Sequence, residues 1–306
     1  MIRVGLQLPN FTFPGVGPGS LFGTIARTAT SGEQHGFDSI WVMDHFYQLP
    51  ALGPPDHEML ESYTLLGGLA AVTATARLGT LVTGVTYRNP AILAKQVTTL
   101  DVLSNGRALL GIGAAWYDFE HRSLGVPFPP VGERMDRLEE ALQICRAMFG
   151  DQRPTFEGRY YRVEGAINQP PPVQPGGPPI LVGGSGERRT LRAAGRYADA
   201  VNLICARADI PRKRAALARH AEEAGRDPAT INTTWLASAI VGDAPDAGLG
   251  DRVLSGTAAA IAERAAEATV GQGLDGVILN FPLQSDQPDT VASVGEAVRE
   301  AVGGGR

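Results

Sequence analysis

Residues 20–45, SLFGTIARTATSGEQHGFDSIWVMDH, contain the unit on which the predicted fold rests. Apolar residues recur at helical spacing up to Gly36, and a glycine at that point is a typical helix stop. Ser39–Met43 follows as a short apolar run, which indicates a parallel strand that is buried on both faces. The polar pair Asp44 and His45 then ends the strand. A helix and a buried strand in alternation are the repeating unit of an α/β fold.

This unit recurs along the chain of 306 residues. We expect strands at Val4–Leu8, Ser39–Met43, Leu78–Val82, Ala108–Gly113, Ile180–Gly183, Ala200–Ile204, Thr233–Val241 and Gly276–Phe281. We expect helices at Ser20–Gly36, Glu61–Ala76, Pro90–Ser104, Glu133–Phe149, Glu187–Arg196, Ile210–Ala224, Thr257–Gln272 and Pro288–Val302. This alternation favours a (β/α)8 TIM barrel over an open doubly wound sheet, and we predict a single α/β domain over residues 1–306.

Three predicted connections are longer than those typical of a barrel. Phe46–Leu60 is an insertion after strand 2. Gly150–Pro179 is an insertion between helix 4 and strand 5, and it contains the hairpin-like run Thr155–Val163. Asp243–Gly256 is expected to be a polar surface loop.

The composition excludes several classes of protein. The formal net charge is −5, which argues against a nucleic-acid partner. No apolar run reaches the length of a membrane span, and Met1 leads directly into the first predicted strand, so we expect neither a membrane segment nor a secretory signal. Cys145 and Cys205 are the only cysteines, which is typical of a reducing, cytoplasmic compartment.

The chemistry of a TIM barrel is found at the carboxyl ends of its strands. Lys95 and Lys213 are the only lysines and lie in predicted helices, which argues against a Schiff-base enzyme. Asp44 is the only carboxylate that ends a predicted strand, whereas a retaining glycosidase needs two. The sequence has no His-x-His pair and predicts no metal site. A metal-dependent hydrolase stays an alternative only if His45, His57 and His121 meet.

Two strand ends carry the strongest candidate groups. His45 is the best candidate acid or base, because imidazole titrates near neutral pH and Asp44 could orient it. The alternative is that this pair only caps the strand. Gly183-Gly-Ser-Gly186 follows a strand and precedes a helix, where backbone amides can hold a phosphate. The alternative there is an ordinary tight turn.

Other strand-end residues are candidates for a substrate pocket, namely Asn10, Trp116 and Phe281. Trp41 lies within a strand and is predicted to be core. Glu120, together with His121, follows Trp116 closely and could cap a helix or contact substrate.

Taken in order, several motifs resemble a known family. They are GFDSIWVMDH at 36–45, TGVTYRNP at 83–90, GIGAAW at 111–116 and PILVGGSG at 179–186. The chain resembles the bacterial luciferase-like superfamily of barrel flavoproteins, and most closely its coenzyme F420-dependent branch. The resemblance covers nearly the whole chain.

The resemblance implies a cofactor ring at the carboxyl end of the barrel and a small-molecule substrate beside it. It implies a non-prolyl cis peptide within Leu81–Val85, a phosphate at the turn after strand five, and proton transfer by His45. The implied catalytic residues are Asp44 and His45. The implied cofactor-binding residues are Asp44, Val82, Thr83, Gly84, Val85, Gly113, Gly183, Gly184, Ser185, Gly186 and Asn202. The family also implies a homodimer that packs through the second and third helices.

Two departures from the family pattern bear on the activity. Some F420-dependent dehydrogenases carry Trp where this chain has Leu49, and some carry Glu where it has Trp116. The second departure fits a reductase. The leading prediction is an F420-dependent oxidoreductase that transfers a hydride. The alternatives are an FMN-dependent monooxygenase, which uses O2 and reduced flavin from a partner reductase, and a non-catalytic flavin-binding protein.

Overall fold

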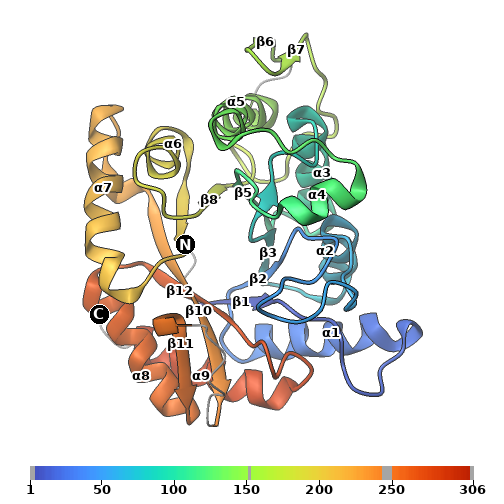
Figure 1. Cartoon of the computed structure of the whole chain (residues 1–306), viewed down its shortest axis with the longest axis vertical. Helices are drawn as coiled ribbons and strands as arrows, with labels where there is room; N and C mark the ends of the chain where they lie inside the picture. Colours follow the sequence, from blue (N-terminus) through green and yellow to red (C-terminus); the bar gives the residue numbers. More distant parts are fainter. Residues whose placement is uncertain (1–3, 151–152, 243–249, 304–306) are drawn as a thin grey trace.

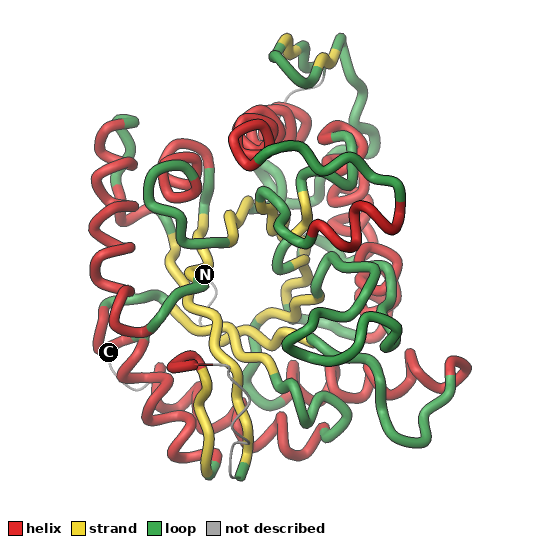
Figure 2. The backbone as a smooth tube through the Cα atoms, in the orientation of Figure 1, coloured by secondary structure: helices red, strands yellow, loops and turns green. Residues whose placement is uncertain are grey.

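The computed structural model describes residues 4–150, 153–242 and 250–303. At its centre, parallel strands form a closed ring with helices outside it (Figures 1 and 2). The ring consists of β1 (Val4–Leu8), β2 (Ser39–Val42), β3 (Arg77–Thr80), β5 (Ala108–Gly113), β8 (Ile180–Gly183), β9 (Ala200–Leu203), β10 (Asn232–Val241) and β12 (Gly276–Asn280). Neighbours in chain order pair in parallel, and β12 pairs with β1 to close the ring. The predicted (β/α)8 barrel is confirmed.

The helices follow the strands in the predicted order. They are α1 (Pro18–Gln34), α2 (Ser62–Val72), α3 (Pro90–Leu103), α4 (Asp118–Leu124), α5 (Val131–Gly150), α6 (Thr190–Tyr197), α7 (Ile210–Glu223), α8 (Ala258–Ala268) and α9 (Pro288–Gly303). The short helix α4 was not predicted, and it lies in the connection between β5 and α5.

Three helix boundaries differ from the prediction by three residues or more. The helix α8 ends at Ala268 rather than Gln272, and a short 3-10 turn follows at Val270–Gln272. The helix α2 ends at Val72 rather than Ala76, because the carboxylate of Glu33 accepts the amides of residues 74–76 and holds them outside the helix. The helix α6 begins at Thr190 rather than Glu187, whose carboxylate instead pairs with the Lys213 ammonium at 2.8 Å.

The third predicted strand, Leu78–Val82, is interrupted. The strand β3 ends at Thr80, and β4 (Thr83–Gly84) continues the pairing with β5. The peptide bond between Leu81 and Val82 is cis, within the window that the family resemblance implied.

The two later insertions have different outcomes: the first contains the expected hairpin, and the second differs from the prediction. The hairpin expected within Thr155–Val163 is present as β6 (Phe156–Glu157) and β7 (Arg162–Val163). The expected polar loop Asp243–Gly256 is wrong at its end, because Val253–Gly256 forms β11 and pairs with the second half of β10. The second half of β10 extends beyond the barrel, and its free edge pairs with β11. Residues 243–249 lie outside the described part of the chain.

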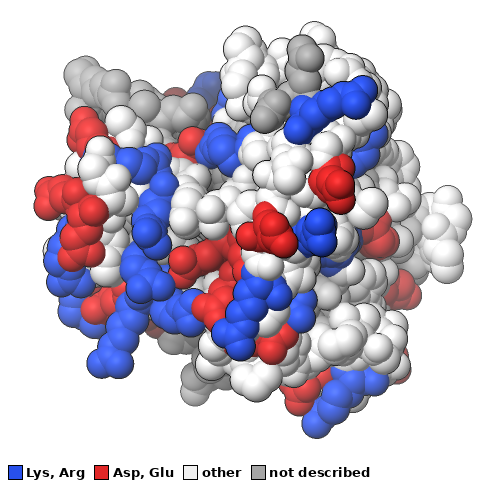
Figure 3. All heavy atoms as spheres, turned by 90° about the horizontal axis from the view of Figure 1, so that it is seen from above, with Lys and Arg blue, Asp and Glu red and all other residues white. Residues whose placement is uncertain are grey.

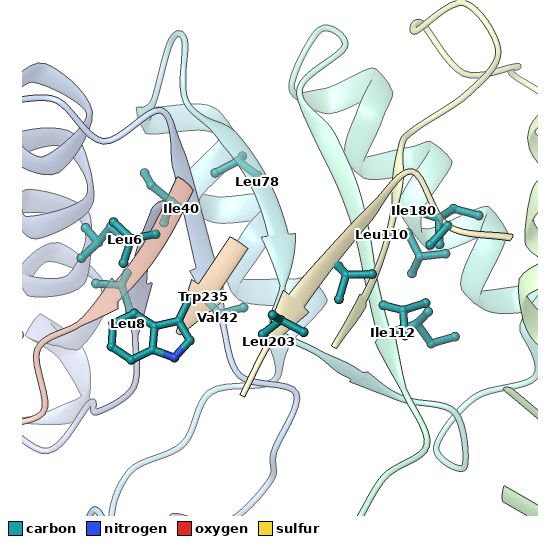
Figure 4. Packing of buried hydrophobic residues seen from close by; sticks show 14 of the residues in the cluster. Leu6, Leu8, Ile40, Val42, Leu78, Leu110, Ile112, Ile180, Leu203 and Trp235 are labelled. Carbon is teal, nitrogen blue, oxygen red and sulfur yellow. The ribbon is translucent and has the colours of Figure 1, made fainter. Parts of the chain in front are cut away.

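Two hydrophobic layers build the barrel. Trp41 is fully buried inside it, as predicted, where a Cβ atom at Gly5 or Gly79 would come within 2.9 Å of the indole. Leu81, Leu109, Leu181 and Ile278 pack in the same interior layer. The second layer lies between strands and helices, and Figure 4 shows part of it, including Leu6, Ile40 and Leu110.

Arginines on the outer helices are largely engaged in ion pairs. Glu139 on α5 pairs with Arg189, Arg192 and Arg196 at 3.0–3.7 Å. Basic and acidic side chains lie intermixed on the side of the molecule shown in Figure 3. Within the described residues, no helix combines the length and the apolar character needed to cross a membrane.

Candidate active site

His45 and Glu120 form a pair at the carboxyl end of the barrel. His45 follows β2, and its Nδ1 lies 3.0 Å from Oε2 of Glu120 on α4. The Glu120 side chain is fully buried, whereas that of His45 is 14% exposed. Within the described residues, the ring makes no second hydrogen bond. Since a carboxylate only accepts, Nδ1 carries the proton of the neutral ring and Nε2 is a free acceptor.

Glu120 also fixes the loop after β2. Its Oε1 accepts the amides of Phe46 and Tyr47, and its Oε2 accepts the hydroxyl of Tyr87 in addition to His45. Burial raises the pKa of Glu120, but the hydrogen bonds from His45, Tyr87 and Phe46 outweigh it, so the pKa lies below its ordinary value of 4.5. Glu120 is therefore an ionised carboxylate that orients His45.

The Asp44 carboxylate is held by several neighbouring groups. Its Oδ1 accepts from the Ser62 hydroxyl at 2.6 Å, its Oδ2 accepts the Gly84 amide at 3.1 Å, and both oxygens accept from Arg88. Burial lowers the pKa of Arg88, but the neighbouring Asp44 carboxylate raises it above its ordinary value overall. The carboxylate is thus saturated by β4, α2 and Arg88. The structure shows a positioning contact for Asp44, and its catalytic and cofactor contacts stay predictions.

Val82 meets two predicted glycines at the inner wall of the barrel. A Cβ atom at Gly113 would lie 2.8 Å from Cγ2 of Val82, and one at Gly183 would lie 2.5 Å from Cγ1. Only glycine leaves room for Val82 at these two positions. The structure therefore brings Val82, Gly113 and Gly183 together.

The next three predicted cofactor residues are buried in the wall behind Val82. The Thr83 hydroxyl lies 2.7 Å from the hydroxyl of Tyr63, the Gly84 amide donates to Asp44, and the Val85 amide donates to Gly113. These groups hold β4 in place.

Amide side chains form a polar layer inside the barrel. Asn280 donates to Gln7 at 3.0 Å, and Asn202 donates to Thr234 at 2.9 Å. The Oδ1 atoms of Asn202 and Asn280 are buried, and neither accepts a hydrogen bond from the described residues. Buried acceptors are nearly always satisfied. This layer therefore has hydrogen-bonding capacity that the described residues do not use.

The turn after β8 offers fewer free donors than the sequence predicted. The Gly184 amide donates to the Asn202 carbonyl, and the Ser185 hydroxyl donates to the Ile204 carbonyl at 2.7 Å. Among the described hydrogen bonds, none involves the amides of Ser185 and Gly186. These two amides, just before α6, are the groups that could hold an anion.

The three predicted pocket residues lie in different surroundings. Trp116 is 60% exposed and its ring centroid lies 5.9 Å from that of His45. Asn10 is half-buried, and its Oδ1 accepts the Thr12 amide. Phe281 is fully buried and packs edge-on against Phe37 at 6.2 Å. Phe281 points outward from β12 into the core, so its assignment to the pocket is wrong.

His121 is a packed histidine. Its Nδ1 donates to the Tyr117 carbonyl, its Nε2 accepts from the Thr86 hydroxyl at 2.7 Å, and its ring stacks on Tyr87 at 4.5 Å. The structure shows His121 in neither of the two roles considered from the sequence, a helix cap and a substrate contact. No group of three metal-ligating side chains occurs in the described part of the chain.

The pairing of Glu120 with His45 was missed from the sequence. The two residues are 75 positions apart, and α4, which presents Glu120, was not predicted. The usable signal is the run Asp118-Phe-Glu-His-Arg122, in which acidic residues precede basic ones, as in a short helix.

Comparison with known proteins shows where the chain belongs. Residues 2–275 match the family model described as luciferase-like monooxygenase. An F420-dependent glucose-6-phosphate dehydrogenase of Kineococcus radiotolerans is 37% identical over 184 residues, which are 60% of this chain and 52% of that protein. A phthiodiolone/phenolphthiodiolone dimycocerosates ketoreductase of Mycobacterium bovis is 35% identical over 227 residues, 68% of this chain and 58% of that protein. The chain thus spans little more than half the length of these curated relatives.

Solved structures share the fold at lower identity. An F420-dependent secondary alcohol dehydrogenase in complex with an F420-acetone adduct superposes with a TM-score of 0.79 at 20% identity, over 96% of this chain and 99% of that one. An EDTA monooxygenase from Chelativorans sp. BNC1 gives 0.83 at 15% identity, over 99% and 93%. The barrel is common to all of them. Since the family model covers most of the length of this chain, the chain belongs to the luciferase-like monooxygenase family.

Proposed function

We propose that this protein is a coenzyme F420-dependent oxidoreductase that acts on a small organic substrate at the carboxyl end of the barrel. The observation that carries the proposal is the His45–Glu120 pair, because it leaves one ring nitrogen of His45 free at the edge of the barrel. Relatives at 36–37% identity are F420-dependent glucose-6-phosphate dehydrogenases, and the ketoreductase relative supports carbonyl reduction.

The residues at the barrel end fit a planar cofactor. Val82 would support the ring from behind, and Gly113 and Gly183 leave the room that its side chain occupies. The unsatisfied acceptors in the amide layer would take donors from the ring, and the free amides of Ser185 and Gly186 would take the phosphate. When bound, coenzyme F420 supplies a hydride donor or acceptor that resists oxygen.

His45 would move the proton of the reaction. Glu120 holds Nδ1 as the donor, so Nε2 can accept a proton from a substrate hydroxyl or, once protonated, return it to a carbonyl oxygen. The buried, ionised carboxylate stabilises the imidazolium that forms. Asp44 would act at a distance, by holding β4 and Arg88 in place.

An FMN-dependent monooxygenase is the second candidate, because the matching family model is described by that activity. Consumption of oxygen distinguishes this candidate from the F420-dependent oxidoreductase. In that case reduced FMN from a partner reductase would be consumed together with O2.

A turnover assay separates the two functions. The protein is incubated with reduced F420 and a panel of ketones, once without oxygen and once in air, while F420 absorbance and dissolved oxygen are followed. A parallel incubation in air contains reduced FMN in place of reduced F420. The proposal expects ketone-dependent oxidation of F420 at the same rate in both atmospheres. Turnover that requires FMN and consumes oxygen would overturn it.

A further inference from the structure

Four aromatic residues form a continuous surface beside His45. We call Tyr47, Trp116, Tyr117 and Phe119 the aromatic shelf. Within it, the ring centroids of Trp116 and Tyr117 stack at 5.2 Å, those of Tyr117 and Phe119 lie 5.9 Å apart, and those of Tyr47 and Phe119 also lie 5.9 Å apart. The His45 ring touches the shelf through Trp116 at 5.9 Å and Tyr117 at 6.0 Å. The shelf therefore runs from His45 to the surface.

The shelf is open to solvent at two of its rings, Trp116 beside His45 and Phe119 farther along. Trp116 is 60% exposed and Phe119 is 45% exposed, although large aromatic side chains are mostly covered in folded proteins. The residue before Trp116 has an unusual backbone, because Ala115 has a φ of +59°, a conformation that non-glycine residues rarely adopt. That turn carries the chain out of the barrel wall just before Trp116. Unfavourable backbone conformations of this kind concentrate at functional sites.

The two segments that carry the shelf offer an anionic ligand no free cation, and Arg134 on α5 lies next to them, where its Nε donates to the Ala114 carbonyl at 3.0 Å. The segments 44–47 and 115–124 contain three carboxylates, those of Asp44, Asp118 and Glu120, against one guanidinium, that of Arg122. Arg122 is paired with Asp118 at 3.2 Å. Asp44 is neutralised by Arg88, which also binds Glu61. The described part of these segments therefore offers a phosphate ester no unpaired cation.

We propose that the aromatic shelf is the substrate subsite and that it takes a neutral, planar aromatic or conjugated ketone. The inference rests on the proposed function, because it uses His45 as the group that meets the carbonyl oxygen. Flat apolar rings stack on aromatic side chains, and a neutral compound needs no cation, which these two segments do not offer. A sugar phosphate would gain neither contact. The preferred substrate would then differ in class from that of the glucose-6-phosphate dehydrogenase relatives.

Binding can be measured without turnover, because the three tryptophans differ in exposure. Trp41 and Trp235 are fully buried, so Trp116 is the tryptophan on which a ligand at the barrel end can stack, and calorimetry checks the affinity that fluorescence quenching gives. The probe is 2-acetonaphthone, and glucose 6-phosphate is the comparison. Both are titrated by fluorescence and by calorimetry into the protein with and without oxidised F420.

Three variants locate the probe. Trp116→Ala should weaken binding of 2-acetonaphthone about five- to tenfold, and Trp116→Phe should restore most of it, because stacking needs only an aromatic ring. Phe22→Ala is the matched control, since Phe22 is an aromatic residue 40% exposed on α1, and it should bind like the parent. Calorimetry serves for the Trp116 variants, which lack the reporter.

The outcomes separate this proposal from the proposed function. The proposed subsite would be overturned, even if F420 binds, by either of two results. One is equal binding of 2-acetonaphthone by Trp116→Ala and the parent, and the other is tighter binding of glucose 6-phosphate than of the ketone. Shelf binding by a protein that does not bind F420 would support the subsite and reject the proposed function. Sedimentation velocity tests whether a second copy of the chain, rather than a ligand, binds the shelf. If the parent is a dimer and Trp116→Ala converts it to a monomer, the subsite is overturned.

Discussion

At the residue scale, His45 is the side chain whose replacement separates chemistry from binding. We expect His45→Ala to lower turnover about 10²–10⁴-fold, since a positioned acid or base contributes that much. Cofactor affinity should change by less than about 1.5 kcal/mol, because at most one polar contact is lost. Steady-state kinetics with a matched substrate and a direct binding titration measure the two effects.

The variant His45→Asn sharpens this test, because Asn keeps a hydrogen-bonding group but does not titrate. It should be as slow as the Ala variant. Parental turnover by the Asn variant would make His45 a positioning residue. Loss of cofactor binding by the Ala variant would place it in the cofactor cradle instead.

Glu120→Gln tests whether Glu120 fixes the tautomer of His45. The amide group of Gln can donate to Nδ1, which moves the ring proton to Nε2 and removes the free acceptor. The corresponding change in a serine-protease triad lowers kcat about 10⁴-fold. We expect turnover to fall by at least about 10²-fold while cofactor affinity stays near the parental value. An unchanged kcat would show that Glu120 only anchors the loop after β2.

The same carboxylate makes the stability of the protein depend on pH. The pKa of Glu120 is lowered in the folded protein from 4.5, since hydrogen bonds outweigh burial. A group with a depressed folded pKa stabilises the fold above its unfolded pKa, and that contribution is lost as the pH falls through the folded pKa. Urea denaturation at pH 7 and at pH 4 should show a smaller acid loss for Glu120→Gln than for the parent. An equal loss would contradict this account.

Single residues also show what the sequence could predict. The positions of His45 and Val82 near strand ends could be predicted, because a known motif order marks them, and their roles stay predictions. Asp44 carried the same signal, yet its carboxylate turns outward, because neighbouring residues of an extended chain point to opposite sides. Nothing in the local sequence could show that Arg88, Ser62 and Gly84 would saturate it.

At the scale of elements, the turn between β8 and α6 is the predicted phosphate site. Gly184 has a φ of +122°, so any side chain there is strained. Gly184→Ala introduces that strain alone, and Gly184→Asp adds a negative charge beside the free amides of Ser185 and Gly186. We expect cofactor affinity to fall at least about tenfold more in the Asp variant than in the Ala variant.

Thermal unfolding of both Gly184 variants is the control, since they should lose similar stability. Equal cofactor affinities for the two variants would mean that the phosphate lies elsewhere, and the turns after β10 and β12 would be tested next.

Elements with a clear hydrophobic period were predicted well, and short or irregular ones were not. The pattern of apolar runs predicted the ends of the barrel strands within one or two residues. It did not predict α4 and β11, which have seven and four residues. The helix α4 is too short to show a helical period, and β11 buries only Leu254, so it lacks the continuous buried run of the equally short β2, β8 and β9. The elements α4 and β11 form because the barrel supplies a partner, as when β10 provides an edge for β11.

At the scale of the whole molecule, the barrel explains why distant residues meet. Parallel strands place all their carboxyl ends on one face, so His45, Val82, Gly183 and Asn280 converge although they span most of the chain. The order of motifs was sufficient to predict this face. The substrate was not predictable, because the aromatic shelf depends on how α4 and the loop after β2 pack together.

The central claim concerns the cofactor, and one measurement tests it most directly. The apoprotein is titrated with F420 and with FMN under the same conditions, and binding is followed by fluorescence. The account predicts that F420 binds at least about tenfold more tightly, a difference of about 1.4 kcal/mol that modest contacts can supply. Equal affinities, or tighter binding of FMN, would contradict it and favour the monooxygenase.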